Sequence, residues 1–161
     1  DLSLEVDFNQ GLDARLIDER IALRLKRLKM PLVRLAYDSN QNRNPLKKAI
    51  NLLKSTGIKG RKILVYCLYN TKYDTPDNFL NRIKDIIDWD VVAYPIRYEP
   101  LEPRPKNTYV SPNWTIEQLE MIAKARRVIG YGGAFPPYEG LKKKILNEKS
   151  FKKAFELRPT R

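Results

Sequence analysis

The chain has 161 residues, of which 42% are apolar and 31% charged, a composition typical of one folded globular domain. No apolar run approaches the ~20 residues of a membrane-spanning helix, and no signal peptide is visible. The net charge of +12 is weak evidence for a polyanionic partner, and a lysine-rich solvated surface is the favoured explanation.

The first predicted strand covers residues 2–8, where apolar and polar side chains alternate strictly. A turn-like segment, FNQGLDAR, follows it. Apolar positions at helical spacing then predict a helix over residues 15–29, which Pro31 ends. Residues 32–38 form the second predicted strand. Because the chain opens at Asp1 directly in a strand pattern, we expect a piece of a longer protein.

The second helix is predicted from its end signals, with Asn44 as cap, Pro45 as first helical residue and Gly57 at the end. The third strand, residues 62–70, is the uninterrupted run KILVYCLYN, which is typical of a strand buried on both faces. Cys67 lies within this run, so we expect a core residue. This one cysteine indicates reducing, cytoplasmic surroundings, and the absence of histidine excludes Ser-His or Cys-His catalysis.

Thr75 and Pro76 predict the start of a third helix, again as cap and first residue. The fourth predicted strand is VVAYPIRY, residues 91–98, in which Pro95 indicates an edge strand or a bulge. A strand-then-helix unit of about thirty residues is thus repeated three times and begins a fourth, the size of a βαβ crossover.

These units predict an α/β fold. In residues 1–101 we expect a partial parallel (β/α) barrel fragment with about four strands and helices on one outer face, and a doubly wound sheet is the alternative. The charged side chains of Glu5, Asp7, Arg34 and Asp38 indicate an open interior that holds a polar ligand. Residues 102–161 are expected to add a Pro-rich strap across the end of the sheet and C-terminal helices, the first of them started by the capping box of Thr115 and Gln118.

Polar side chains follow each predicted strand. The carboxyl ends of parallel β/α strands lie on one rim, so these groups should converge. They are Asn9, Gln10 and Arg15 after the first strand, Asp38 and Ser39 after the second, Asn70 and Asp74 after the third, and Arg97 and Tyr98 after the fourth. Each also has a structural interpretation as a turn, a cap or an ion-pair member.

Four segments together resemble the C-terminal two-thirds of a radical S-adenosylmethionine (radical SAM) core. They are FNQGLDARLIDERIALRLKRL, LVRLAYDS, AINLLKSTGIKGRKILVYCLYNTKYDTPDNFLNRI and VVAYPIRYEPL. The family often writes the third strand as G-x-I-x-G-x-x-E, whereas here Asn70 stands near the second glycine and Asp74 near the glutamate. The resemblance implies a six-stranded partial barrel, of which this chain would supply the last four strands.

The resemblance also implies that S-adenosylmethionine (SAM) lies across the strand ends. Asp38 and Ser39 stand where the family contacts the ribose. Leu68 and Asn70 would flank the adenine, which backbone groups of residues 94–98, among them Tyr98, would hold. Either Arg15 or Arg97 is expected to face the methionine carboxylate.

The family's C-x-x-x-C-x-x-C loop, which holds a [4Fe–4S] cluster, is absent from this sequence. So is the glycine-rich strand that contacts the amino group of SAM. The resemblance places both upstream of Asp1. We therefore expect a parent enzyme that reductively cleaves SAM to a 5′-deoxyadenosyl radical on an unknown substrate, while this chain alone is inactive.

Two other functions stay open at this point. One is a non-catalytic α/β module whose basic surface binds nucleic acid or a protein partner, although no RNA-binding signature is present. The other is a flavin- or nucleotide-binding doubly wound domain, which the missing glycine-rich first turn disfavours. A fragment would leave its first strand with a bare edge. We expect the strap, a C-terminal helix or a second copy in a homo-oligomer to cover it.

Overall fold

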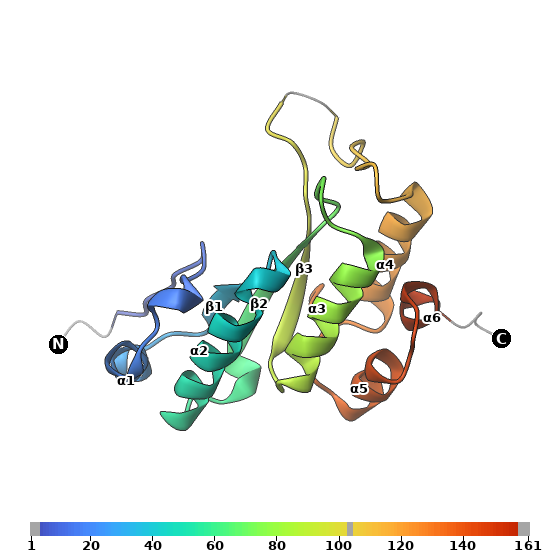
Figure 1. Cartoon of the computed structure of the whole chain (residues 1–161). Helices are drawn as coiled ribbons and strands as arrows, with labels where there is room; N and C mark the ends of the chain where they lie inside the picture. The colour runs from blue at the N-terminus through green and yellow to red at the C-terminus, as the bar shows by residue number, and fades with distance from the viewer. Residues whose placement is uncertain (1–3, 103–104, 158–161) are drawn as a thin grey trace.

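An open, parallel three-stranded sheet organises the computed structural model, which describes residues 4–102 and 105–157 (Figure 1). The strands are β1 (Val33–Ala36), β2 (Ile63–Tyr69) and β3 (Val92–Arg97), in the spatial order β1-β2-β3. Leu35 is in register with Val65, and Val65 with Ala93. The predicted α/β class with parallel strands in sequential order is confirmed.

Six α-helices accompany the sheet in the described part of the chain. They are α1 (Glu19–Arg27), α2 (Arg43–Ser55), α3 (Pro76–Asp88), α4 (Ile116–Val128), α5 (Glu139–Leu146) and α6 (Phe151–Phe155). Three short 3-10 turns, η1 (Ala14–Leu16), η2 (Asn40–Asn42) and η3 (Gly60–Lys62), precede α1, α2 and β2. None of the helices in the described ranges combines the length and the apolarity needed to span a membrane.

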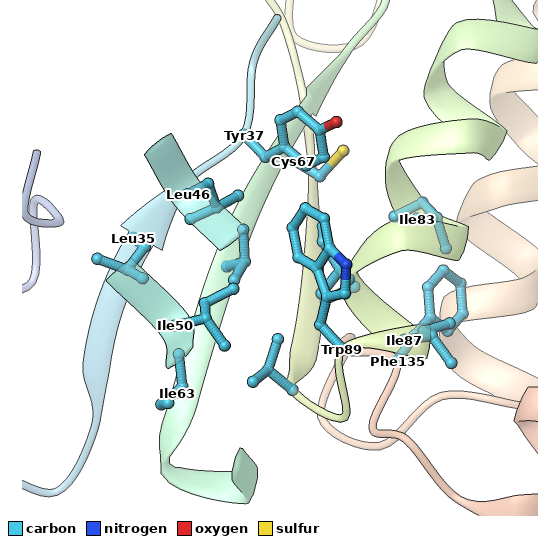
Figure 2. Close-up of a cluster of buried hydrophobic side chains, with 14 of the residues drawn as sticks. Leu35, Tyr37, Leu46, Ile50, Ile63, Cys67, Ile83, Ile87, Trp89 and Phe135 are labelled. Atoms are coloured by element: carbon cyan, nitrogen blue, oxygen red, sulfur yellow. The ribbon is translucent and has the colours of Figure 1, made fainter. Parts of the chain in front are cut away.

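Alternate residues of all three strands point toward α2 and α3 and form the main core with them. Figure 2 shows this cluster with side chains from the strands, Leu35, Ile63 and Cys67, and from the helices, Leu46, Ile50, Ile83 and Ile87. Cys67 is fully buried, so the expected core role of this thiol is confirmed. The same core extends from Ile17 to Phe155 and therefore includes residues of α4, α5 and α6.

Local capping signals explain several helix starts. Thr75 accepts a hydrogen bond from the Asn78 amide and Pro76 opens α3, as predicted. The capping box before α4 is also present. The predicted start of α2 at Asn44 and Pro45 is wrong, because the 3-10 turn η2 runs directly into the helix and Arg43 becomes its first residue.

The predicted strand over residues 2–8 is not confirmed. Residues 4–8 lie outside the sheet, with Leu4 and Phe8 69% and 40% exposed, and residues 1–3 lie outside the described part. The chain turns at Gly11, whose φ is +86°, so Leu12 reaches β1 and donates to the Arg34 carbonyl at 2.8 Å. Strict alternation specifies a strand only where a layer covers the apolar positions, and no layer covers Leu4 and Phe8 within the described ranges.

The outer edge of the sheet on this side therefore belongs to β1, where Leu12 donates to the Arg34 carbonyl, rather than to the predicted first strand. The strap and the C-terminal helices lie on the β3 side (Figure 1), so the prediction that they cover the first edge is wrong. The edge of β3 is covered in part, because Ala93 and Phe135 exchange two backbone hydrogen bonds of 3.0 and 2.7 Å.

Gly60 offers a sharp test of this packing. A Cβ atom at Gly60 would come within 2.0 Å of the Asp90 carbonyl oxygen, so Gly60→Ala must displace η3 or the turn after α3. We expect a loss of about 1–3 kcal/mol in the free energy of unfolding, measured by urea denaturation. Gly140→Ala is the matched control, since its Cβ would meet nothing within 4 Å. Equal stability of the two variants would contradict the packing described here.

Candidate ligand-binding rim and open sheet face

The sheet face opposite α2 and α3, called the open face below, carries a small apolar cluster of its own. This cluster joins Leu64 of β2 and Val92 of β3 to Ala134, separately from the main core. Tyr66, in the middle of the face, donates a hydrogen bond from its hydroxyl to the Asn9 carbonyl at 3.1 Å. The open face therefore holds apolar and aromatic side chains outside the core that the helices cover.

The N-terminal segment reaches the β1 side of this face through polar contacts. Arg34 forms an ion pair with Asp7, so two of the four charged residues predicted for the interior neutralise each other. The side chains of Asn9 and Gln10 are exposed in the turn that follows. They stand at the edge of the face rather than at the strand ends.

Asp38 is the central polar group of the rim, by which we mean the carboxyl ends of the three strands. Its carboxylate accepts a hydrogen bond from the Leu68 backbone N–H at 3.2 Å. Burial of the carboxyl group raises the pKa of Asp38, and the Leu68 hydrogen bond opposes that shift. Asp38 as a whole residue is exposed at the rim, so a ligand can approach the part of its carboxyl group that neighbouring residues leave uncovered.

Ser39, the neighbour of Asp38, acts as a cap in this structure. Its hydroxyl oxygen accepts a hydrogen bond from the Gln41 amide at 3.3 Å and so starts η2. Ser39 is exposed beside Asp38, but its hydrogen bond supports the predicted alternative, a capping residue, rather than a ligand contact.

Asp74 is held in a buried ion pair with Arg82, a residue of α3. The two side chains are only 4% and 3% exposed, and the two guanidinium nitrogens donate to the two carboxylate oxygens at 2.9 Å each. Burial disfavours the charge of Arg82, but the bonds to Asp74 outweigh this and raise the pKa of Arg82. Arg82 also donates to the Leu68 carbonyl at 2.8 Å. Asp74 is therefore a structural residue whose two carboxylate oxygens are both engaged.

Arg82 was not predicted from the sequence, although one signal was present. Arg82 occupies the buried face of α3 between Phe79 and Ile83, where a charged residue needs a buried partner. That partner is Asp74, the acidic residue that follows β2.

Asn70 fastens the strap, residues 99–112, to the end of β2. Its φ is +69° and its side chain is fully buried. The amide nitrogen donates to the carbonyls of Tyr98 and Tyr109 at 3.2 and 3.0 Å, and the amide oxygen accepts from the Ser111 N–H at 2.9 Å. Within the described residues, the segment that follows β3 is thus tied to the end of β2, and the side chain of Asn70 is committed to it rather than to a ligand.

Arg97 and Tyr98 serve the same strap. Arg97 donates to the carbonyls of Asn107 and Tyr109 at 3.0 and 2.9 Å and forms an ion pair with Glu99. The ring of Tyr98 meets Tyr109 edge to face at 5.9 Å. These contacts position the strap above β3 and engage Nη2 of Arg97 in two hydrogen bonds.

Arg15 lies on the β1 side of the rim and faces solvent. Its guanidinium donates to both carboxylate oxygens of Asp13, and these hydrogen bonds lower the pKa of Asp13 to about 2. Arg15 also lines a hollow of about 230 Å³ together with Ala36 and Asn42. Of the two arginines proposed for a ligand carboxylate, Arg15 is the one whose guanidinium is accessible.

Replacing Asn70 should release the strap. Asn70→Ala removes three hydrogen bonds, and we expect a loss of about 2–4 kcal/mol of stability and faster hydrogen exchange at the Ser111 amide. Asn70→Gly is the control that tolerates the positive φ, so it isolates the contribution of the hydrogen bonds. Unchanged protection of the Ser111 amide in both variants would contradict the anchoring role.

The raised pKa of Asp38 predicts a pH-dependent change in stability. In the folded state the charged carboxylate is disfavoured, so its cost is complete above the raised folded pKa and disappears as the pH falls through that value toward the unfolded pKa, ~3.9. Asp38→Asn keeps an acceptor for the Leu68 N–H and removes that cost. We expect the variant to be more stable at neutral pH by less than about 1 kcal/mol, because solvent screens the exposed group. A variant that is less stable at neutral pH would show that the hydrogen bond dominates.

Comparison with known proteins gives no match. No family model, no curated protein and no solved structure matches the chain. The assignment of a function therefore depends on the geometry of the rim and the open face, together with the motifs read from the sequence.

Proposed function

We propose that this chain is the C-terminal part of a radical SAM domain and that its rim binds the adenosyl part of SAM. The observation that carries the proposal is Asp38, an accessible carboxylate with a raised pKa that is fixed by the Leu68 amide. A fixed carboxylate suits the two adjacent ribose hydroxyls, which are hydrogen-bond donors. This is the position at which the family resemblance expects the ribose contact.

Leu68 supports the same placement of the ligand. Its backbone N–H holds the Asp38 carboxylate, and its half-buried side chain on the open face offers an apolar surface for the adenine ring. For the methionine carboxylate the accessible Arg15, 69% exposed, is favoured over Arg97, which is only 18% exposed and whose Nη2 donates to two strap carbonyls. Arg15 would exchange its partner Asp13 for the ligand.

A partial (β/α) barrel fragment with about four strands is the fold that we propose for this chain, within a complete domain of six strands. Three strands in sequential order with helices on one face are compatible with such a barrel. The exposed apolar residues Leu4 and Phe8 support a fourth strand in residues 2–8, which would join β1 once an upstream neighbour covers them.

The iron–sulfur cluster implied by the resemblance does not fit the residues of this chain. Cys67 is the one cysteine, it is fully buried, and burial raises its thiol pKa to about 12. A thiolate ligand is therefore not available here. In our proposal this chain binds and orients SAM, and the cluster and the cleavage chemistry belong to another part of a cytoplasmic parent protein.

An NMR titration of the labelled chain with SAM tests this function. We expect weak binding with shifts concentrated at Asp38, Leu68 and Arg15, because the chain supplies one wall of the site. Asp38→Ala should weaken binding about tenfold or more, since a hydrogen bond to a charged group is lost. Asp88→Ala, an exposed carboxylate at the end of α3, is the matched control. Absence of rim shifts up to about 5 mM SAM would contradict the proposal.

A further inference from the structure

A second hollow lies on the open face, near the amino ends of the strands and away from the rim. It has a volume of about 760 Å³. Leu64 and Val92 form part of its apolar floor, and its walls include Tyr94, Tyr131 and Tyr138. Tyr131 and Tyr138 are 76% and 61% exposed, so two aromatic side chains are offered to solvent beside a concave surface.

Hydrogen bonds order the loop that carries these aromatic residues. Tyr131 and Ala134 exchange two backbone hydrogen bonds of 2.8 and 3.0 Å, and Phe135 is paired with Ala93 of β3. The Arg126 side chain donates to the Gly133 carbonyl at 2.7 Å. Since the loop is already ordered, a ligand that stacks on it does not have to supply the entropy of ordering.

Tyr94 is fixed in the wall of the hollow by two ring contacts. The guanidinium carbon of Arg126 lies 5.0 Å from the ring centroid of Tyr94. The ring of Tyr66 meets Tyr94 edge to face at 5.8 Å. These contacts link the hollow to the aromatic residue in the middle of the open face.

The charge around the hollow is positive. Lys59 and Arg61 line it, and within the described ranges their side chains have no ion-pair partner. Asp90, the carboxylate that lines the hollow, is bound by Lys142 at 2.6 Å, and this bond lowers the pKa of Asp90. The Asp90 carboxylate is thus neutralised, while Lys59 and Arg61 stay available to bind an anion in a chain of net charge +12.

We propose that this hollow binds single-stranded nucleic acid, with bases stacked on Tyr131 and Tyr138 and phosphates against Lys59 and Arg61. Exposed aromatic rings beside a cationic groove are the features that hold single strands, because every base has a face that can stack. A duplex keeps its bases stacked on each other and cannot use these rings. The proposal is independent of SAM binding, since the two sites lie toward opposite ends of the strands.

Fluorescence anisotropy with a labelled oligothymidine of about twelve nucleotides tests the stacking. The double variant Tyr131→Ala/Tyr138→Ala should lose about tenfold or more in affinity. Tyr73→Ala is the matched control, because Tyr73 is 84% exposed in the loop before α3. An unchanged affinity of the double variant, or equal affinity of the chain for duplex and single-stranded DNA, would overturn the proposal.

The salt dependence of the same binding tests the role of the two cations. Lys59→Gln/Arg61→Gln should reduce the slope of log K against log salt by about 0.7 for each phosphate that is no longer neutralised. Lys47→Gln/Lys48→Gln on the exposed face of α2 is the matched charge control. Equal effects of the two charge variants would mean general attraction to polyanions and would overturn the proposed binding site.

Binding of a proline-rich peptide in place of the oligonucleotide would overturn the proposal in favour of a peptide-binding groove. Circular dichroism checks that each variant is folded.

Discussion

The backbone of Leu68 is the point on which the rim depends. In a β-strand the N–H and C=O of one residue point to the same side, and on this side β1 has already ended at Ala36. Two charged side chains replace the missing strand, because Asp38 accepts from the N–H and Arg82 donates to the C=O. An unpaired buried peptide group is costly, so these bonds let β2 extend beyond its neighbour.

The placement of Asp38 and Arg82 beside the Leu68 peptide group also determines the electrostatics of the rim. Arg82 lies between two carboxylates, pairs with the buried Asp74 and acts on Asp38 only through space. The Asp74 carboxylate is therefore neutralised and inaccessible, while the Asp38 carboxylate stays accessible and has a raised pKa. Removing one member of the Arg82–Asp74 pair would leave a buried charge, which typically costs about 3–5 kcal/mol. The Arg82–Asp74 pair stabilises the Leu68 peptide group, which in turn fixes the Asp38 carboxylate.

Sequence patterns predicted the parts of this structure that local chemistry determines. The apolar run of β2, the Thr75 cap with Pro76 and the Thr115 capping box each depend on neighbours in the chain. The anchors of Asn70 could not be predicted in this way, because its partners are 28, 39 and 41 residues away. The strand predicted over residues 2–8 is not confirmed in its described part, residues 4–8, because alternation indicates an apolar face without showing whether anything covers it.

The two ends of the open face differ in the sign of the charge that they leave unpaired. At the rim, Arg82 and Arg97 are bound to carboxylates and carbonyls, and Asp38 is left without an ion pair in the described part of the chain. At the hollow, Lys142 neutralises Asp90, and the cations Lys59 and Arg61 are left without an ion-pair partner in the described ranges. A phosphate would be repelled by the rim carboxylate, whereas ribose hydroxyls and a sulfonium centre would be favoured there. The distribution of charge thus assigns different ligand chemistry to each end, although both ends share the same strands.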